Sequence, residues 1–218
     1  MITAREEILE SIRRALGREG ALEPSIASAL SRRLKDCPPH VQPVLAGQLT
    51  ECFVAKLETV NASVDRVEAP GNIAQAVEAY LSEHELAECF AAGSGDALRE
   101  VVWPGHLTLE HRAATRNDRI ALSEAFLGVA ETGSLVFVSS VRSPTTLNFL
   151  PEHHIAVVRV TRLVRHLEDA WRLLRQELAT VPRTVNFITG PSKTADVEQT
   201  IEYGAHGPRR LHVIVVAT

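Results

Sequence analysis

The chain has 218 residues, 45% of them hydrophobic, and a formal net charge of −4 at pH 7. This length and apolar content allow a sizeable core within one main domain. The acidic balance argues against nucleic acid as a partner, because nucleic-acid binding requires a basic stripe or face.

The N-terminal part of the chain predicts a helix followed by an arm. Thr3 and Glu6 have the spacing of a capping box, and apolar residues then recur at helical period. The two faces of this helix are well separated, so it could pack on the domain, on a second copy of the chain in a homo-oligomer, or on a partner protein. Residues 18–42 are rich in proline and indicate a linker or extended arm. We therefore divide the chain into an N-terminal helix and arm at 1–42 and an α/β domain at 43–218.

Helical and strand patterns alternate through the rest of the chain. The predicted helices lie at 44–57, 73–81 and 167–178. The predicted strands lie at 63–67, 87–92, 101–103, 120–126, 135–138, 155–160, 185–188 and 211–216. The run at 155–160 is continuous and β-branched, which is typical of a strand covered on both faces. Strands separated by helices predict a mostly parallel sheet in a layered α/β fold, with an antiparallel pair possible within 120–138.

The segment TGPSKTADVEQTIEYGAHGPR at 189–209 combines two Gly-Pro turns, hydroxyl groups, a lysine and a predicted short helix. A strand ending at Thr189 and a turn at Gly190 would present backbone N–H groups and hydroxyls to a small carboxylate or phosphate at the start of that helix. The segment is not a P-loop, because Ser192 replaces the glycine that must precede the lysine. Asp196 and Glu198 in the predicted first turn would repel a phosphate, and a helix cap without a ligand stays open as the alternative. The candidate ligand-binding residues here are Thr189, Gly190, Pro191, Ser192, Lys193, Thr194, Asp196, Gly207 and Arg209.

A second cluster, GVAETGS at 128–134, also interrupts two apolar runs. A carboxylate such as Glu131, held at a bend between strands, can act as a nucleophile, a base or a hydroxyl acceptor. Thr132 and Ser134 are neighbouring hydroxyl donors, and we include both with Gly133 among the candidate ligand contacts. The alternative is a turn in which Gly133 has positive φ and Glu131 is solvated. We expect this bend and the bend before the predicted helix to form opposite walls of one cleft.

Histidines offer one further candidate catalytic residue. His206 stands between glycines and is the histidine that we expect to face the cleft, although a structural histidine at a turn fits equally well. No other His or Cys stands at metal-ligand spacing with it, so no metal site is predicted. His153 and His154 are adjacent on a predicted strand, and their rings should point to opposite faces.

Two weaker motifs follow predicted strands. Gly93-Ser94-Gly95 begins a dinucleotide fingerprint, but Leu98 stands where the third glycine belongs, so a simple turn between strand and helix is the more usual interpretation. A polar set after the strand at 135–138 could face a ligand, although most such loops are solvated. This set consists of Ser140, Arg142, Ser143, Thr145 and Thr146.

The cysteines and the apolar runs indicate where the protein functions. Cys37, Cys52 and Cys89 are scattered and show no C-x-x-C spacing, which is typical of reduced thiols in the cytosol and excludes a four-cysteine iron–sulfur or zinc site. No run approaches the roughly 18 apolar residues of a membrane span. We expect a soluble, cytoplasmic protein that carries no cluster of its own.

Four motifs, in this order, resemble the LUD-domain family: GVAETGSLVF at 128–137, LPEHHIAVV at 150–158, ITGPSKTADVE at 188–198 and GAHGPRRLHVIVV at 204–216. The resemblance covers residues 43–218. It implies a three-layer α/β/α domain similar in fold to glucosamine-6-phosphate deaminase, ribose-phosphate isomerase and CoA transferases.

The same resemblance implies a role in the bacterial oxidation of L-lactate to pyruvate, as the cluster-free component beside two partner proteins that carry iron–sulfur clusters. CoA transferases of this fold use a glutamate in a Glu-Asn-Gly turn, and Glu131 stands in a similar setting with Thr132 in place of the Asn. Two other functions stay open. The chain could be a free-standing enzyme acting on a small anion, phosphosugar or CoA ester, or a non-catalytic assembly or regulatory module.

Overall fold

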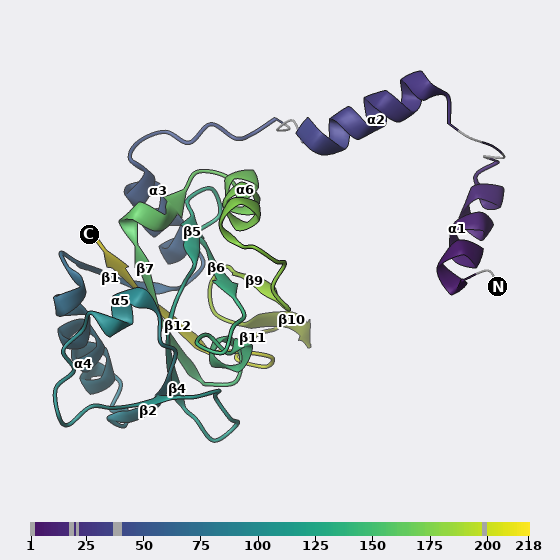
Figure 1. The fold of residues 1–218 in the computed structure, drawn as a ribbon. Helices are drawn as coiled ribbons and strands as arrows, with labels where there is room; N and C mark the ends of the chain where they lie inside the picture. Colours follow the sequence, from purple (N-terminus) through teal and green to yellow (C-terminus); the bar gives the residue numbers. More distant parts are fainter. Residues whose placement is uncertain (1–2, 18–19, 21, 37–40, 198–199) are drawn as a thin grey trace. The chain divides into compact units, whose positions relative to one another are not determined.

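The computed structural model describes residues 3–17, 20, 22–36, 41–197 and 200–218. The chain forms two compact units, 1–42 and 43–218 (Figure 1). No helix in the described parts of the chain has the length and apolar character needed to cross a membrane.

The first unit contains two helices, α1 (Ala4–Ala15) and α2 (Pro24–Asp36). The predicted capping box at the start of α1 is confirmed, because Thr3 Oγ1 accepts the N–H of Glu6 and the Glu6 carboxylate accepts the N–H of Thr3. The extended arm predicted for 18–42 is wrong at 24–36. Pro24 suits the first position of a helix, where its missing N–H is not needed, and apolar residues recur every four positions behind it.

A six-stranded parallel sheet forms the centre of the second unit, in the order β1-β12-β7-β4-β2-β3. Its strands are β1 (Ser63–Val67), β2 (Cys89–Ala92), β3 (Thr108–His111), β4 (Ile120–Glu124), β7 (His153–Arg159) and β12 (Arg210–Val216). Every pair in this sheet is parallel, as the alternation of strands and helices predicts. The carboxyl ends of β2, β4 and β7 therefore meet at one edge of the sheet.

Both faces of this sheet are covered. On one face, Ile155 and Val157 of β7 pack in the same core as Val77 of α4 (Ile73–Glu83), together with the short helix α5 (Asp96–Arg99). On the other face, Ala156 and Val158 pack in a second core with α3 (Leu49–Thr59). Because successive side chains of β7 point to opposite faces, this strand contributes to both cores, as its unbroken apolar run predicts.

A smaller four-stranded sheet lies over the α3 face, in the order β8-β5-β6-β9. Its strands are β5 (Leu127–Val129), β6 (Ser134–Val138), β8 (Leu163–Val164) and β9 (Val185–Ile188), and α6 (Leu167–Glu177) packs against it through Ala170 and Leu174. The pairing of β5 with β6 is antiparallel, so the antiparallel pair expected within 120–138 is confirmed. The α/β class with a mostly parallel central sheet and layers on both faces is also confirmed.

The chain passes from the central sheet to the smaller sheet within two residues. Ala125 N–H donates to the carbonyl of Val157 in the central sheet, and Phe126 N–H donates to the carbonyl of Val136 in the smaller sheet, each at 2.8 Å. The single strand predicted for 120–126 therefore ends at Glu124.

Three short 3₁₀ turns, η1 (Pro70–Asn72), η2 (Thr145–Asn148) and η3 (Val160–Arg162), complete the connections. The strand predicted at 101–103 is wrong, because this apolar stretch packs beside α5 as a loop, with Trp103 Nε1 donating to the carbonyl of Leu98. The strand beside β2 is instead β3. The helix predicted from residue 44 begins at Leu49.

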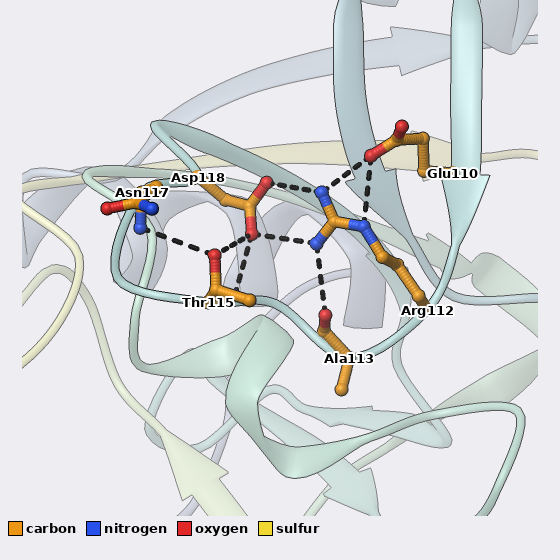
Figure 2. A network of polar contacts seen from close by, with 6 residues as sticks. All are labelled: Glu110, Arg112, Ala113, Thr115, Asn117 and Asp118. Carbon is orange, nitrogen blue, oxygen red and sulfur yellow. Dashed lines mark hydrogen bonds and ion pairs between the residues drawn. The ribbon is translucent and has the colours of Figure 1, made fainter.

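The loop that leads from β3 to β4 is held by one ionic network (Figure 2). The Arg112 guanidinium donates to both carboxylate oxygens of Asp118, at 2.8 and 2.7 Å, and also to the carboxylate of Glu110. The same Asp118 carboxylate accepts the N–H of Thr115 at 2.6 Å. These contacts hold the pKa of Asp118 well below its usual range, chiefly because of the hydrogen bonds from Arg112.

The segment after Gly190 forms a hairpin of β10 (Lys193–Val197) and β11 (Thr200–Tyr203), and the short helix predicted there is wrong. Polar and apolar residues alternate from 194 to 197, which is the period of a strand. Asp196 is therefore a strand residue, and Glu198, predicted in the first helical turn, lies outside the described residues.

Candidate functional site

The two bends that the sequence singles out lie side by side. Strands β6 and β9 pair in an antiparallel register with Leu135 opposite Ile188. Just beyond this pair, Ser134 Oγ lies 2.6 Å from Thr189 Oγ1 and 2.6 Å from Thr132 Oγ1. The expected convergence of the two bends is thus confirmed, but their hydroxyl groups are in direct contact and are not opposite walls of an open cleft.

Gly133 and Gly190 allow both bends to pack closely on α3 and the residue that follows it. Their φ angles are +70° and +81°, a region that favours glycine. A Cβ on Gly133 would lie 2.8 Å from Lys56 Cβ, and one on Gly190 would lie 2.7 Å from the carbonyl oxygen of Val60. The positive φ of Gly133 is the one expected if residues 131–134 form a turn, which is the alternative to a ligand site given above.

The Glu131 carboxylate caps the start of α6. Its Oε2 accepts the N–H of Leu167 at 3.3 Å and lies 3.2 Å from Nδ1 of His166. Asp169 completes this helix start by accepting the N–H of His166 at 3.1 Å. A carboxylate at a helix N-terminus stabilises the helix dipole. The structure thus gives Glu131 a structural contact that the sequence did not indicate, and a catalytic role for it stays a prediction.

The remaining predicted residues lie around Ser192. Its N–H donates to the carbonyl of Pro208, its carbonyl accepts the N–H of Gly204, and Gly207 packs beside its side chain. Because a strand and not a helix follows Gly190, the helix-terminus part of the predicted anion site is wrong. His206 is exposed on the connecting loop.

Further along the same segment, the Lys193 ammonium lies 5.7 Å from the ring centroid of Tyr203, and Thr194 pairs with Glu202 across the hairpin. Pro191 and Arg209 line a cavity of about 510 Å³ at the amino ends of β1 and β12. Neither this cavity nor the larger one at the opposite edge has Glu131 or His206 among its described lining residues.

The larger cavity, of about 670 Å³, lies at the carboxyl edge of the central sheet. Gly93, Ser94 and Gly95 follow β2, while Glu124 ends β4 and Arg159 ends β7. A loop after β6 adds Ser140, Arg142 and Ser143. The two weak motifs of the sequence, the glycine pair and the polar loop, are therefore neighbours. The carboxyl edge of a parallel sheet is where α/β proteins usually bind their ligands.

Glu124 is the most perturbed carboxylate of this cavity. Burial is the largest influence and raises the pKa of Glu124, although the N–H of Ala97 donates to its Oε2 at 2.8 Å and Arg159 lies 3.9 Å away. Gly95 makes room for this side chain, since a Cβ there would lie 2.5 Å from Glu124 Cβ. A carboxylate with a raised pKa in a cavity is suited to proton transfer.

The three arginines of the cavity differ in their partners. Arg159 pairs with Glu100 at 2.5 Å, and Arg162 pairs with Glu177 at 2.9 Å through each of two nitrogens. Arg142 is exposed, and within the described parts of the chain its guanidinium has no ion pair. Arg142 is therefore the cation of this cavity that is free to bind an anion.

His153 and His154 point to opposite faces of β7, as the sequence predicts. His153 Nδ1 lies 2.9 Å from the hydroxyl of Tyr80, and His154 Nε2 lies 2.7 Å from Oγ of Ser123. Burial lowers the pKa of each to about 4. Among the described residues no three His, Cys, Asp or Glu side chains are grouped to hold a metal ion.

Comparison with known proteins identifies relatives of the whole second unit. The sequence model of the LUD domain matches residues 50–216. "Lactate utilization protein C" of Bacillus subtilis is 37% identical over 109 residues, which are 49% of this chain and 45% of that protein. The protein of the same name from an Exiguobacterium species is 28% identical over 99% of this chain and 96% of its own length.

Another lactate utilization protein C, from Geobacillus thermodenitrificans, is 32% identical, and the match spans about half of each chain, as it does for most of these relatives. Among solved structures, a DUF162 family protein from Deinococcus radiodurans aligns with a TM-score of 0.60 over 80% of this chain and 100% of that chain. At 16% identity, this likeness supports the fold alone.

Proposed function

Because the chain belongs to the LUD-domain family, we propose that it acts in bacterial lactate utilisation and binds a small 2-hydroxy or 2-oxo acid in the cavity between Glu124 and Arg142. The names of its relatives support the role, and the cavity at the carboxyl edge supports the site. The proposed system oxidises L-lactate to pyruvate together with two proteins that carry iron–sulfur clusters, while this chain contributes no cluster.

The chemistry of the cavity matches such an acid. The planar guanidinium of Arg142 can donate two parallel hydrogen bonds to a carboxylate. The carboxyl group of Glu124, with its raised pKa, is suited to exchange a proton with a 2-hydroxyl group. The part proposed for this chain is therefore binding, orientation and transfer of the hydroxyl proton, while the two electrons and the second proton, from C2, pass to the partner proteins.

Calorimetric titration of the full chain with L-lactate and with pyruvate tests the site. Loss of one charge-assisted hydrogen bond in Arg142→Gln should weaken binding by about 10- to 150-fold, since such a bond is worth about 1.5–3 kcal/mol. Glu124→Gln should change the pH dependence of binding. Arg116→Gln is the matched control, because Arg116 is also exposed but lies outside the cavity.

The same titration separates this site from the one first predicted. If Glu131→Gln abolishes binding while Arg142→Gln leaves it intact, the ligand lies at the hydroxyl cluster of Thr132, Ser134 and Thr189, and the carboxyl-edge site is refuted. Binding that no variant alters would refute both sites.

The pathway role has its own test. Isolation of the chain from cells should yield two iron–sulfur proteins and lactate-dependent electron transfer. Turnover of a phosphosugar or CoA ester by the isolated chain would instead establish a free-standing enzyme, and lactate oxidation that survives loss of the cavity residues would establish an assembly module.

A further inference from the structure

We propose that the site at Arg142 accepts, besides lactate, acids whose apolar chain is longer than the methyl group of lactate, and that this chain lies in a groove beside Trp171. The inference rests on the proposed function, because it extends the same site and defines the substrate class more closely.

The groove lies where α6 ends against β9 and has a volume of about 280 Å³. Its walls are mainly apolar and include Trp171, Leu174, Val181 and Pro182. Trp171 is 43% exposed and Val181 is 92% exposed, although the surrounding layer is otherwise well packed. Large apolar side chains gathered around a hollow bind apolar groups, since covering them removes their surface from water.

The groove is adjacent to the carboxyl-edge cavity. Leu178 lines both hollows. Val138 lines the cavity and Val185 lines the groove, and the two are directly opposite each other in the pairing of β6 with β9. Side chains opposite each other in an antiparallel pair point to the same face and lie about 5 Å apart. An apolar wall therefore runs from the cavity, past Leu178, to the indole of Trp171.

The volumes and the distribution of charge point to a longer ligand. A water molecule takes about 30 Å³ of liquid, so an acid of six heavy atoms fills only part of a cavity of about 670 Å³. Most charged groups, among them Glu124 and Arg142, line the cavity, whereas the described lining of the groove is mainly apolar and has Arg175 as its one charged residue. A linear 2-hydroxy or 2-oxo acid of about six to eight carbons would place its carboxylate at Arg142 and its apolar chain in the groove.

Titration of the full chain with a homologous series tests this inference. The series is L-lactate, 2-hydroxybutanoate, 2-hydroxyhexanoate and 2-hydroxyoctanoate. Binding should tighten by about fourfold for each methylene group that enters the groove, which is equivalent to about 0.8 kcal/mol. The longer acids should also change the tryptophan fluorescence, and Trp171→Phe should remove that change because the second tryptophan, Trp103, lies outside the groove.

Val181→Lys should abolish the gain in affinity with chain length, because it places a charge in the groove. Val102→Lys is the control, since Val102 is 89% exposed and lies outside both hollows. Equal affinity for lactate and 2-hydroxyoctanoate would overturn the inference and leave the proposed lactate site standing. A chain-length gain that persists in Val181→Lys would also overturn it. Failure of the whole series to bind would refute the proposed site itself.

Discussion

Substitution of Gly95 by alanine tests the geometry of the candidate site directly. The backbone at Gly95 has φ −70° and ψ 166°, which alanine adopts without strain. The added Cβ would nevertheless lie 2.5 Å from Cβ and 2.9 Å from Cδ of Glu124. The Glu124 side chain must therefore move, and its hydrogen bond from the N–H of Ala97 is lost.

The expected cost follows from these contacts. A hydrogen bond to a charged group contributes about 1.5–3 kcal/mol. The smaller conformational freedom of alanine in the unfolded chain offsets about 0.4–1 kcal/mol of this. Gly95→Ala should therefore lower the free energy of unfolding by about 0.5–2.6 kcal/mol, or Tm by about 1–10 °C for a domain of this size.

Chemical and thermal denaturation of Gly95→Ala beside Gly105→Ala provides the measurement. A Cβ on Gly105 would meet no atom within 4 Å, and its φ is not positive, so the control should be neutral or slightly stabilised. Lactate affinity should fall in Gly95→Ala together with stability, because the displaced Glu124 belongs to the proposed site. Equal stability of the two variants would refute the account of how Gly95 and Glu124 fit together.

Three further outcomes follow from other parts of the fold. His154 is fully buried with a pKa near 4, so below pH 6.5 the unfolded chain binds a proton that the folded chain does not. Urea denaturation should show stability falling as pH decreases from about 6.5 to 4, with about 3 kcal/mol from His154 at about 1.4 kcal/mol per pH unit and a further loss from His153, whose pKa is lowered in the same way. Unchanged stability between pH 7 and pH 5 would contradict this. Asp118→Asn should lower the free energy of unfolding by about 2 kcal/mol, because the Asp118 side chain is only 12% exposed and binds both Arg112 and a backbone N–H. The control is Glu51→Gln, in the exposed pair with Arg66, which should cost less than about 1 kcal/mol. Gly128→Ala should lower the free energy of unfolding by about 1–3 kcal/mol, because the new Cβ would lie 2.7 Å from Leu163 and 2.8 Å from Phe53. The control for denaturation is Gly71→Ala, where a Cβ would meet no atom within 4 Å, and equal stability of the two variants would contradict the prediction.

Local pattern was sufficient to predict much of the secondary structure. The strands at 63–67 and 185–188 have the predicted limits, because each is an apolar or alternating run with clear turn residues at its ends. The sequence does not predict the hairpin after Gly190, because its polar residues also suit a short exposed helix and polar and apolar side chains alternate there over only a few positions. The sequence does not indicate that the chain changes sheets at Ala125, because the same apolar residues are suitable for either sheet.

The candidate site was less accessible to sequence reasoning. Its residues come from the ends of β2, β4 and β7 and from a loop after β6, and the order of strands in a parallel sheet cannot be read from local pattern. The predicted strand at 120–126 extends past Glu124, so the sequence does not show that Glu124 lies at the edge of the sheet. The sequence offers two weak signals for this site, the glycine pair at 93–95 and the polar set that contains Arg142, and a simple turn and a solvated loop are their more usual interpretations. The contact of Glu131 with α6 could not be predicted from local pattern either, because the helix begins at Leu167, 36 residues later in the chain.

The two-residue passage from β4 to β5 has a mechanical consequence. Ala125 is tied to the central sheet and Phe126 to the smaller one, so neither sheet can tilt without straining the backbone beside Glu124. We therefore expect this side of the cavity to be rigid, and a bound acid should find the carboxyl group of Glu124 already in place. Amide hydrogens from 120 to 129 should accordingly exchange as one slow block.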